Sequence, residues 1–221
     1  MKERYFTIQS LDRQALELYR QVADLSQKKN ISFHPERSAL LVLDMQAYFL
    51  DESSHAYIPS AEAILAGIKV LIKEYHTRGI PIIFTQHINT ASNAGMMSIW
   101  WKDLITSQNP LHRIIPELDL SMGTLIQKSQ YDAFYQTPLE EMLHGMGVTQ
   151  VVLCGVMTHL CCETTARSAF MHGFEVFFPV DGTATYRLDH HRASLLNLAH
   201  GFASIVLIKD VLEAIRGEHE S

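Results

Sequence analysis

The chain has 221 residues, of which 47% are hydrophobic and 19% charged, and its formal net charge is -6 at pH 7. This size and composition predict one large globular domain with a well-buried core. The negative net charge argues against a nucleic-acid partner. No apolar stretch is long enough to span a membrane. Three cysteines, two of them adjacent, argue against a disulfide framework, so we expect a reducing, cytoplasmic location.

Apolar residues recur at helical spacing from Leu11 to Lys28 and predict an N-terminal helix. A polar stretch that contains Pro35 follows this helix. We therefore divide the chain into an N-terminal helical extension, residues 1–32, and one main domain, residues 33–221. The extension is expected to pack on the main domain as an appendage.

From residue 39 onward, apolar strand-like runs alternate with amphipathic helix-like segments. The expected strands are Ala39–Asp44, Ile80–Thr85, Thr124–Lys128, Gln150–Gly155, Glu175–Val180 and Ser204–Ile208. The expected helices are Ser60–Arg78, Pro138–Met146, Leu160–His172, Asp189–Ala199 and Val211–Arg216. Continuous Val, Ile and Leu runs separated by helices predict a parallel sheet covered on both faces. The fold class is therefore a single doubly wound, three-layer α/β domain. The long stretch from Asn89 to Ser121 is expected to be an irregular excursion that shapes a pocket wall or an oligomer contact.

Three reactive side chains lie at or just beyond the ends of expected strands. Asp44 ends the first strand, Lys128 ends the third, and Cys161 follows the turn after the fourth. Because ligands bind beyond the carboxyl ends of parallel strands, the pattern places all three side chains at one rim. At this rim, a helix start and the charge of Lys128 favour the thiolate form of Cys161. Asp44 can act first as general base and then as general acid. Backbone N–H groups of the turn can bind the oxyanion of a tetrahedral intermediate. This arrangement predicts acyl transfer to cysteine, followed by hydrolysis.

Each of these residues also has a purely structural interpretation. Buried cysteines are more often small hydrophobic residues than catalysts, which is our interpretation of Cys154 and Cys162. Asp44 could simply accept backbone hydrogen bonds, and Lys128 could be a surface lysine. The joint position of the three candidates at three strand ends favours catalysis.

Three motifs resemble those of the isochorismatase-like cysteine hydrolases. They are Leu43-Asp44-Met45-Gln46, Lys128 followed by Tyr131-Asp132-Ala133-Phe134, and Gly155-Val156-x-Thr158-His159-x-Cys161. The resemblance covers the chain from about Phe33 to the C-terminus. It implies a six-stranded parallel sheet flanked by helices, and a catalytic triad of Asp44, Lys128 and Cys161. It also implies a cis peptide bond between Val156 and Met157, with the N–H groups of Met157 and Cys161 as oxyanion donors.

In more detail, the chain is similar to the isochorismatases of siderophore and phenazine pathways. Those enzymes cleave a vinyl ether by protonating carbon with the aspartate, and they carry glycine where this chain has Cys161. A glutamine expected after the second strand is also replaced, by His87. These departures favour hydrolysis of a small amide or related C–N bond through a Cys161 thioester. Vinyl-ether hydrolysis by Asp44 without a nucleophile, and a non-catalytic binding protein on the same fold, are the alternatives.

The remaining expectations concern the pocket and the partners of the protein. Candidates for the substrate pocket are Gln46, Phe49, His87, Trp100, Tyr131, Phe134 and His159.

Related nicotinamidases bind a divalent ion through an Asp-x-His pair after the second strand, and the segment Thr85–Asn89 lacks that pair. We therefore expect no metal and no other cofactor, and nicotinamidase activity is disfavoured. The expected partner is a small-molecule substrate, and a homo-oligomer, either a dimer or a tetramer, is expected by analogy.

Overall fold

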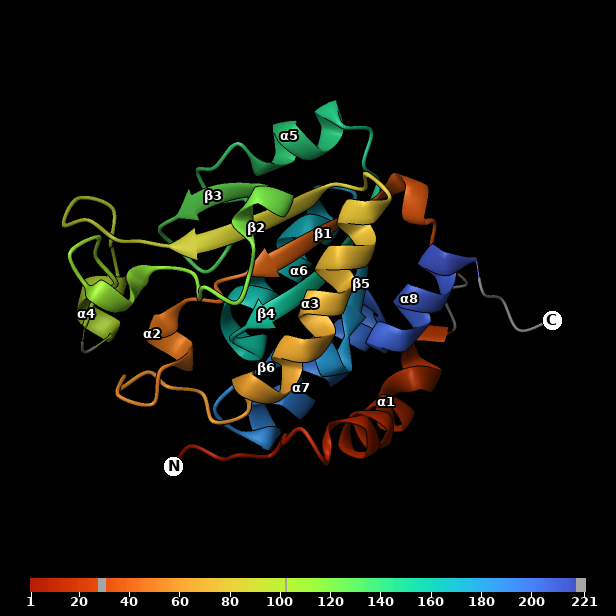
Figure 1. The fold of residues 1–221 in the computed structure, drawn as a ribbon, viewed down its shortest axis with the longest axis horizontal. Coiled ribbons are helices and arrows are strands. Elements are labelled where there is room, and N and C mark those ends of the chain that lie inside the picture. The colour runs from red at the N-terminus through yellow and green to blue at the C-terminus, as the bar shows by residue number, and fades with distance from the viewer. Residues whose placement is uncertain (28–30, 102, 218–221) are drawn as a thin grey trace.

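A parallel sheet forms the centre of the protein (Figure 1). The computed structural model describes residues 1–27, 31–101 and 103–217. The sheet has the strand order β3-β2-β1-β4-β5-β7, and the short β6 pairs with β4. The strands are β1 (Ser38–Leu43), β2 (Ile82–His87), β3 (Thr124–Lys128), β4 (Gln150–Val156), β5 (Glu175–Pro179), β6 (Thr183–Ala184) and β7 (Ala203–Val206). The six expected strands are therefore confirmed, and the two-residue β6 is an addition to them.

Helices cover both faces of this sheet. They are α1 (Leu11–Gln27), α2 (Ala47–Leu50), α3 (Ala61–Thr77), α4 (Met97–Trp100), α5 (Leu139–Gly145), α6 (Glu163–Met171), α7 (Leu188–Gly201) and α8 (Ile208–Arg216). In Figure 1, α3 lies in front of the sheet and α6 behind it, so the predicted three-layer α/β architecture is confirmed. Among the described residues, no helix combines the length and the apolar character that crossing a bilayer requires.

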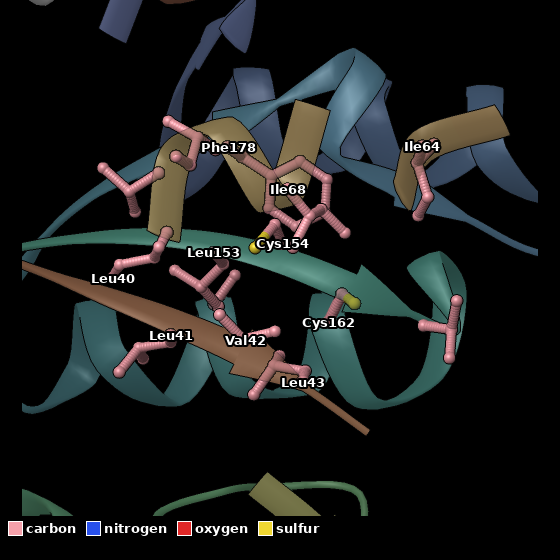
Figure 2. Packing of buried hydrophobic residues seen from close by; sticks show 14 of the residues in the cluster. Leu40, Leu41, Val42, Leu43, Ile64, Ile68, Leu153, Cys154, Cys162 and Phe178 are labelled. Carbon is pink, nitrogen blue, oxygen red and sulfur yellow. The ribbon is translucent and has the colours of Figure 1, made fainter. Parts of the chain in front are cut away.

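The central strands carry continuous apolar runs because both of their faces are buried. Every residue of β1, β2 and β4 is buried. Figure 2 shows Cys154 on the side of β4 that faces Ile68 of α3, and Cys162 on the opposite side of this strand. Both cysteines are fully buried within the apolar core. The structure thus supports the interpretation of Cys154 and Cys162 as small hydrophobic residues.

Helix α1 shares the core of the main domain. Leu18 and Val22 are buried in the same apolar cluster as the sheet, and the helix lies against α7 and β7. The helix ends at Gln27, and the expected end at Lys28 lies outside the described residues. The proposed domain boundary between residues 32 and 33 therefore separates two segments that pack together, and that boundary stays a prediction.

The described part of the segment between β2 and β3 contains short helical turns and one isolated antiparallel bridge, from Ile114 to Gln46. Apart from α4, the helical turns are the 3-10 turns Pro110–His112 and Leu120–Met122. Ile105 and Ile115 of this segment are buried, so it is fixed to the domain although it has little regular structure. Its position beyond the carboxyl ends of the strands makes it a wall of the site described below (Figure 1).

Candidate active site

Asp44 follows β1 and points into the interior at the carboxyl end of the sheet. Its backbone adopts a φ of 51°, which is uncommon for a residue other than glycine and turns the chain sharply after the strand. Thr85, the register neighbour of Leu43 on β2, donates its hydroxyl to Asp44 Oδ1 at 2.6 Å and accepts the Asp44 N–H at 3.1 Å. The first bond fixes Oδ1 and the second holds the backbone of Asp44, so that Oδ2 faces the reactive groups.

Lys128 ends β3 and is fully buried beside Asp44. Its ammonium lies 2.7 Å from Asp44 Oδ2, 2.9 Å from the carbonyl oxygen of Gln130 and 3.3 Å from Cys161 Sγ. The ammonium therefore has one ion-pair partner and two hydrogen-bond acceptors. Burial by itself would lower the pKa of Lys128, but the Asp44 carboxylate and the Cys161 sulfur outweigh this effect and raise it.

The Asp44 carboxylate is ionised in this environment. Burial alone would raise the pKa of Asp44, but the positive charge of Lys128 dominates and holds the pKa below its ordinary value, and a hydrogen bond from Cys161 acts in the same direction. Because Oδ2 has the ion pair with Lys128 and no well-directed hydrogen bond, it remains able to accept a proton.

Cys161 is the nucleophile candidate, and its environment acts on the thiol in two directions. Burial raises the pKa of the Cys161 thiol to about 12; Lys128 opposes this rise and Asp44 adds to it. Desolvation thus outweighs the charge of Lys128, which favours the thiolate as the sequence indicated. A neutral thiol beside an ionised carboxylate is an arrangement in which a proton can pass from Cys161 to Asp44.

The turn that carries Cys161 differs from a simple helix start. The expected helix from Leu160 begins instead as a π-helical turn, Thr158–Cys162, which continues into α6. Gly155 precedes this turn with a φ of 118°, and a Cβ there would lie 2.1 Å from the carbonyl oxygen of Leu43. Only glycine therefore allows β4 to approach β1 so closely at the site.

Met157 lies between Gly155 and the π-helical turn. The peptide bond between Val156 and Met157 is cis. Within the described ranges, the backbone N–H of Met157 has no hydrogen-bond acceptor. Met157 and Cys161 line the same cavity, and a backbone donor without a partner there is suited to a negatively charged oxygen.

His87 is the third group close to Asp44 and Cys161. One ligand atom of each of these residues lies within 4.8 Å of the others. They do not fit a divalent cation, because the Lys128 ammonium already lies 2.7 Å from Asp44 Oδ2 and 3.3 Å from Cys161 Sγ. Burial, assisted by Lys128, lowers the pKa of His87 to about 4, and its Nε2 is bonded to Asn89 Oδ1 at 2.8 Å. His87 is therefore a neutral imidazole in a fixed orientation.

A cavity of about 260 Å³ opens in front of Cys161. Three of the expected pocket residues line it, namely Phe49, His87 and Tyr131. The other lining residues are Lys2, Tyr48, His55, Ala56, Asn89, Met97, Trp101, Asp103, Leu104, Ile105, Met157, Cys161 and Tyr186. The walls are mainly aromatic and aliphatic, as in many sites for small molecules.

The structure places the other four expected pocket residues elsewhere. Gln46 is buried and bonded to backbone groups of His87 and His112, so it joins chain segments near the site. Phe134 stacks on His172, with ring centroids 5.0 Å apart.

His159 is bonded to Thr185 Oγ1 at 2.6 Å, away from the cavity lining. Trp100 is 74% exposed, whereas the next residue, Trp101, lines the cavity and donates its indole N–H to Tyr131 Oη at 2.7 Å. The adjacent tryptophans could not be told apart without knowing that α4 ends between them.

Comparison with known proteins places this site in a family. The sequence matches the family described as the isochorismatase domain over residues 38–210. The chain belongs to the isochorismatase family. It is 39% identical over 174 residues to nicotinamidase 3 of Arabidopsis thaliana, covering 76% of this chain and 84% of that protein. It is 32% identical over 198 residues to enterobactin synthase component B of Escherichia coli, covering 86% of this chain and 68% of that protein.

Structural comparison agrees with this family assignment. A crystal structure of a cysteine hydrolase from Pseudomonas syringae pv. phaseolicola superposes with a TM-score of 0.81 at 24% sequence identity, covering 86% of this chain and 97% of that one. At this identity the likeness concerns the fold. The protein is an isochorismatase-family hydrolase in which Asp44, Lys128 and Cys161 lie together.

Proposed function

We propose that this isochorismatase-family enzyme hydrolyses a small amide or a related C–N bond through a thioester on Cys161. The observation that carries the proposal is the position of the Lys128 ammonium, 2.7 Å from Asp44 Oδ2 and 3.3 Å from Cys161 Sγ. A base, a cation and a thiol are thereby held around one point at the base of the cavity. The relative named a nicotinamidase supports an amide as the substrate class.

The first half-reaction forms the thioester. As the Cys161 sulfur attacks the amide carbonyl carbon, the thiol proton passes to Asp44 Oδ2 and a C–S bond forms. The carbonyl oxygen becomes an oxyanion, which the N–H groups of Met157 and Cys161 bind in our proposal. One such donor contributes roughly 3 kcal/mol to lowering the barrier. When the intermediate collapses, the C–N bond breaks and Asp44 gives its proton to the leaving amine.

The second half-reaction releases the product. Water attacks the thioester carbon while Asp44 takes a proton from the water, and the same oxyanion site is used again. The C–S bond then breaks, Asp44 gives the proton that it took from the water to the leaving sulfur, and a carboxylic acid leaves. Lys128 keeps its proton throughout, because its three contacts stabilise the ammonium, and its charge stabilises negative charge on the sulfur or on Asp44.

A pair of variants tests the proposal. Purified enzyme is assayed for release of ammonia or amine from benzamide, nicotinamide and small carbamoyl compounds, and for turnover of isochorismate. Cys161→Ala and Asp44→Asn should both abolish amide hydrolysis with an unchanged circular dichroism spectrum. Cys162→Ala is the matched control, because that thiol lies in the apolar core and should be dispensable.

The other functional classes give distinct results in the same assays. A vinyl-ether hydrolase that needs no nucleophile would lose activity in Asp44→Asn and keep it in Cys161→Ala. A non-catalytic binding protein would turn over none of the substrates, and its Cys161 would not react with a mild electrophile. Either pattern would overturn the thioester mechanism.

We also propose that the protein acts in a reducing cytoplasm as a homo-oligomer, either a dimer or a tetramer. Its three cysteines are free thiols, and Met96, Ile99 and Trp100 expose their apolar side chains at α4. Light scattering coupled to size exclusion measures the mass directly. A monomer at micromolar concentration would contradict the oligomer.

A further inference from the structure

The N-terminal segment that precedes α1 is fixed against the carboxyl end of the sheet. Figure 1 shows the N-terminus on the side toward which the arrowheads of β1 and β4 point. The Glu3 N–H donates to the carbonyl oxygen of Tyr186 at 2.8 Å, and the Phe6 N–H donates to Ser60 Oγ at 3.1 Å. Tyr5 and Phe6 are buried in the core. Lys2, at the start of this segment, is thereby held at the cavity.

The ammonium of Lys2 is only partly satisfied. It donates to the carbonyl oxygens of His55 at 2.5 Å and Tyr57 at 2.7 Å, and it lies 4.4 Å from the ring centre of Tyr186. These partners carry no formal charge, and two hydrogen bonds leave one of the three N–H donors for another acceptor. Partial burial lowers the pKa of Lys2, which is the effect expected for an ammonium without a counterion.

Nearby carboxylates are each paired with another group. Among the described residues, Glu52 and Glu62 pair with Arg4, and Glu3 pairs with Arg187. Asp103, which also lines the cavity, lies 3.2 Å from His55 Nε2, a contact that is an ion pair when His55 is protonated. The cavity therefore runs from the buried Cys161 to a more exposed rim that includes Lys2. Within residues 1–27, 31–101 and 103–217, the Lys2 ammonium has no ion pair. A substrate anion at this rim would supply the missing counterion.

We propose that Lys2 is a specificity-determining residue that selects amides carrying a carboxylate at the end remote from the scissile bond. This proposal rests on the amide hydrolysis proposed above and names its substrate class. The aromatic and aliphatic walls between Cys161 and Lys2, which include Phe49, Trp101 and Ile105, suit a flat or apolar body joining the two polar ends. The ammonium would then form a charge-assisted hydrogen bond with the carboxylate.

A matched set of substrates tests this selection. We compare kcat/KM for 3-carbamoylbenzoate, 4-carbamoylbenzoate and the neutral 3-methylbenzamide, which share the same type of scissile amide. The better of the two acids should exceed the neutral amide at least tenfold, and the advantage should shrink as salt screens the partly exposed charge. In Lys2→Met this ratio should fall close to one, and Lys2→Arg should restore most of it.

Arg4→Met is the control, because Arg4 carries the same charge on the same segment but pairs with surface glutamates outside the cavity lining. It should keep the ratio of the unmodified enzyme. Equal kcat/KM for acid and neutral amides, or a ratio unchanged in Lys2→Met, overturns the selection while amide hydrolysis stands.

Binding to the Cys161→Ala variant, measured by calorimetry, separates this inference from the proposed reaction. One outcome is that no amide is hydrolysed, yet 3-carbamoylbenzoate binds at least tenfold more tightly than 3-methylbenzamide, and Lys2→Met in the same variant removes this preference. The carboxylate site would then stand, and the proposed reaction would be wrong. Equal binding of the two probes would contradict the carboxylate site independently of any catalysis.

Discussion

Removal of the Lys128 ammonium should destabilise the protein far more than the loss of a surface lysine. Both side chains of the Asp44–Lys128 pair are fully buried, and their charged atoms lie 2.7 Å apart. Lys128→Met leaves the Asp44 carboxylate without its cation in a dry environment. Breaking a buried ion pair in this way costs about 3–5 kcal/mol in the free energy of unfolding. Lys209→Met, at an exposed position on α8, should change this free energy by less than about 0.5 kcal/mol.

The pH dependence of this loss has a definite sign. In the unmodified protein the pKa of Asp44 is lowered, so its contribution to stability is present above the pKa of an unfolded aspartate and is lost as the pH falls through the lower folded pKa. In Lys128→Met, burial acts without the ammonium and raises the pKa of Asp44 above the unfolded value. Its stabilising effect is then present at low pH and lost as the pH rises. The deficit of the variant should therefore be larger near pH 8 than near pH 5.

Urea unfolding followed by circular dichroism at both pH values measures this difference. The double variant Asp44→Asn, Lys128→Met should be less destabilised than the sum of its two single variants, since it contains no unpaired charge. A loss below about 1 kcal/mol in Lys128→Met near pH 8, or a deficit that does not change with pH, would refute the account of the buried pair.

Three further outcomes follow from the site. Thr85→Val removes the 2.6 Å bond to Asp44 Oδ1 and should lower kcat about tenfold, with little change in KM. An unchanged kcat would show that this bond does not position the base. Gly155→Ala should lower the free energy of unfolding, measured in urea, by more than about 4 kcal/mol, because the new Cβ meets a backbone oxygen of β1. Gly145→Ala is the control: no atom lies within 4 Å of its new Cβ, so it should be neutral or slightly stabilising. Equal effects of the two substitutions would contradict the close approach of β4 to β1. The rate of Cys161 alkylation by iodoacetamide should rise about tenfold per pH unit between about pH 7 and pH 10, because burial raises the pKa of this thiol to about 12. Peptide mass mapping measures the rate at this residue. A plateau of the rate near neutral pH would indicate a resting thiolate.

The sequence predicted the sheet and the three reactive residues because both depend on local patterns. Asp44 and Lys128 each follow an apolar run, and the carboxyl ends of parallel strands meet at one edge of the sheet. Their register neighbours, such as Thr85, are set by how the strands pair, which the pattern of a single strand does not contain. The bond from Thr85 to Asp44 was therefore not expected.

The protonation state of Cys161 and the far wall of the cavity depend on tertiary structure. The sequence showed a cysteine near a helix start and a lysine, but not the burial that raises its pKa. Lys2 and Tyr186 are far apart in the sequence and meet because the N-terminal segment lies at the carboxyl end of the sheet. For Trp100 and Trp101, the end of a four-residue helix decides which ring lines the cavity.

The most direct test of the mechanism is the mass of the enzyme during turnover. An amide that the substrate assays identify is mixed with the protein, quenched rapidly in acid and analysed by intact-protein and peptide mass spectrometry. We expect the mass of the acyl group to be added at Cys161, and we expect neither adduct nor turnover in Cys161→Ala. Sustained turnover by Cys161→Ala, without any adduct in either protein, would contradict covalent catalysis by this thiol.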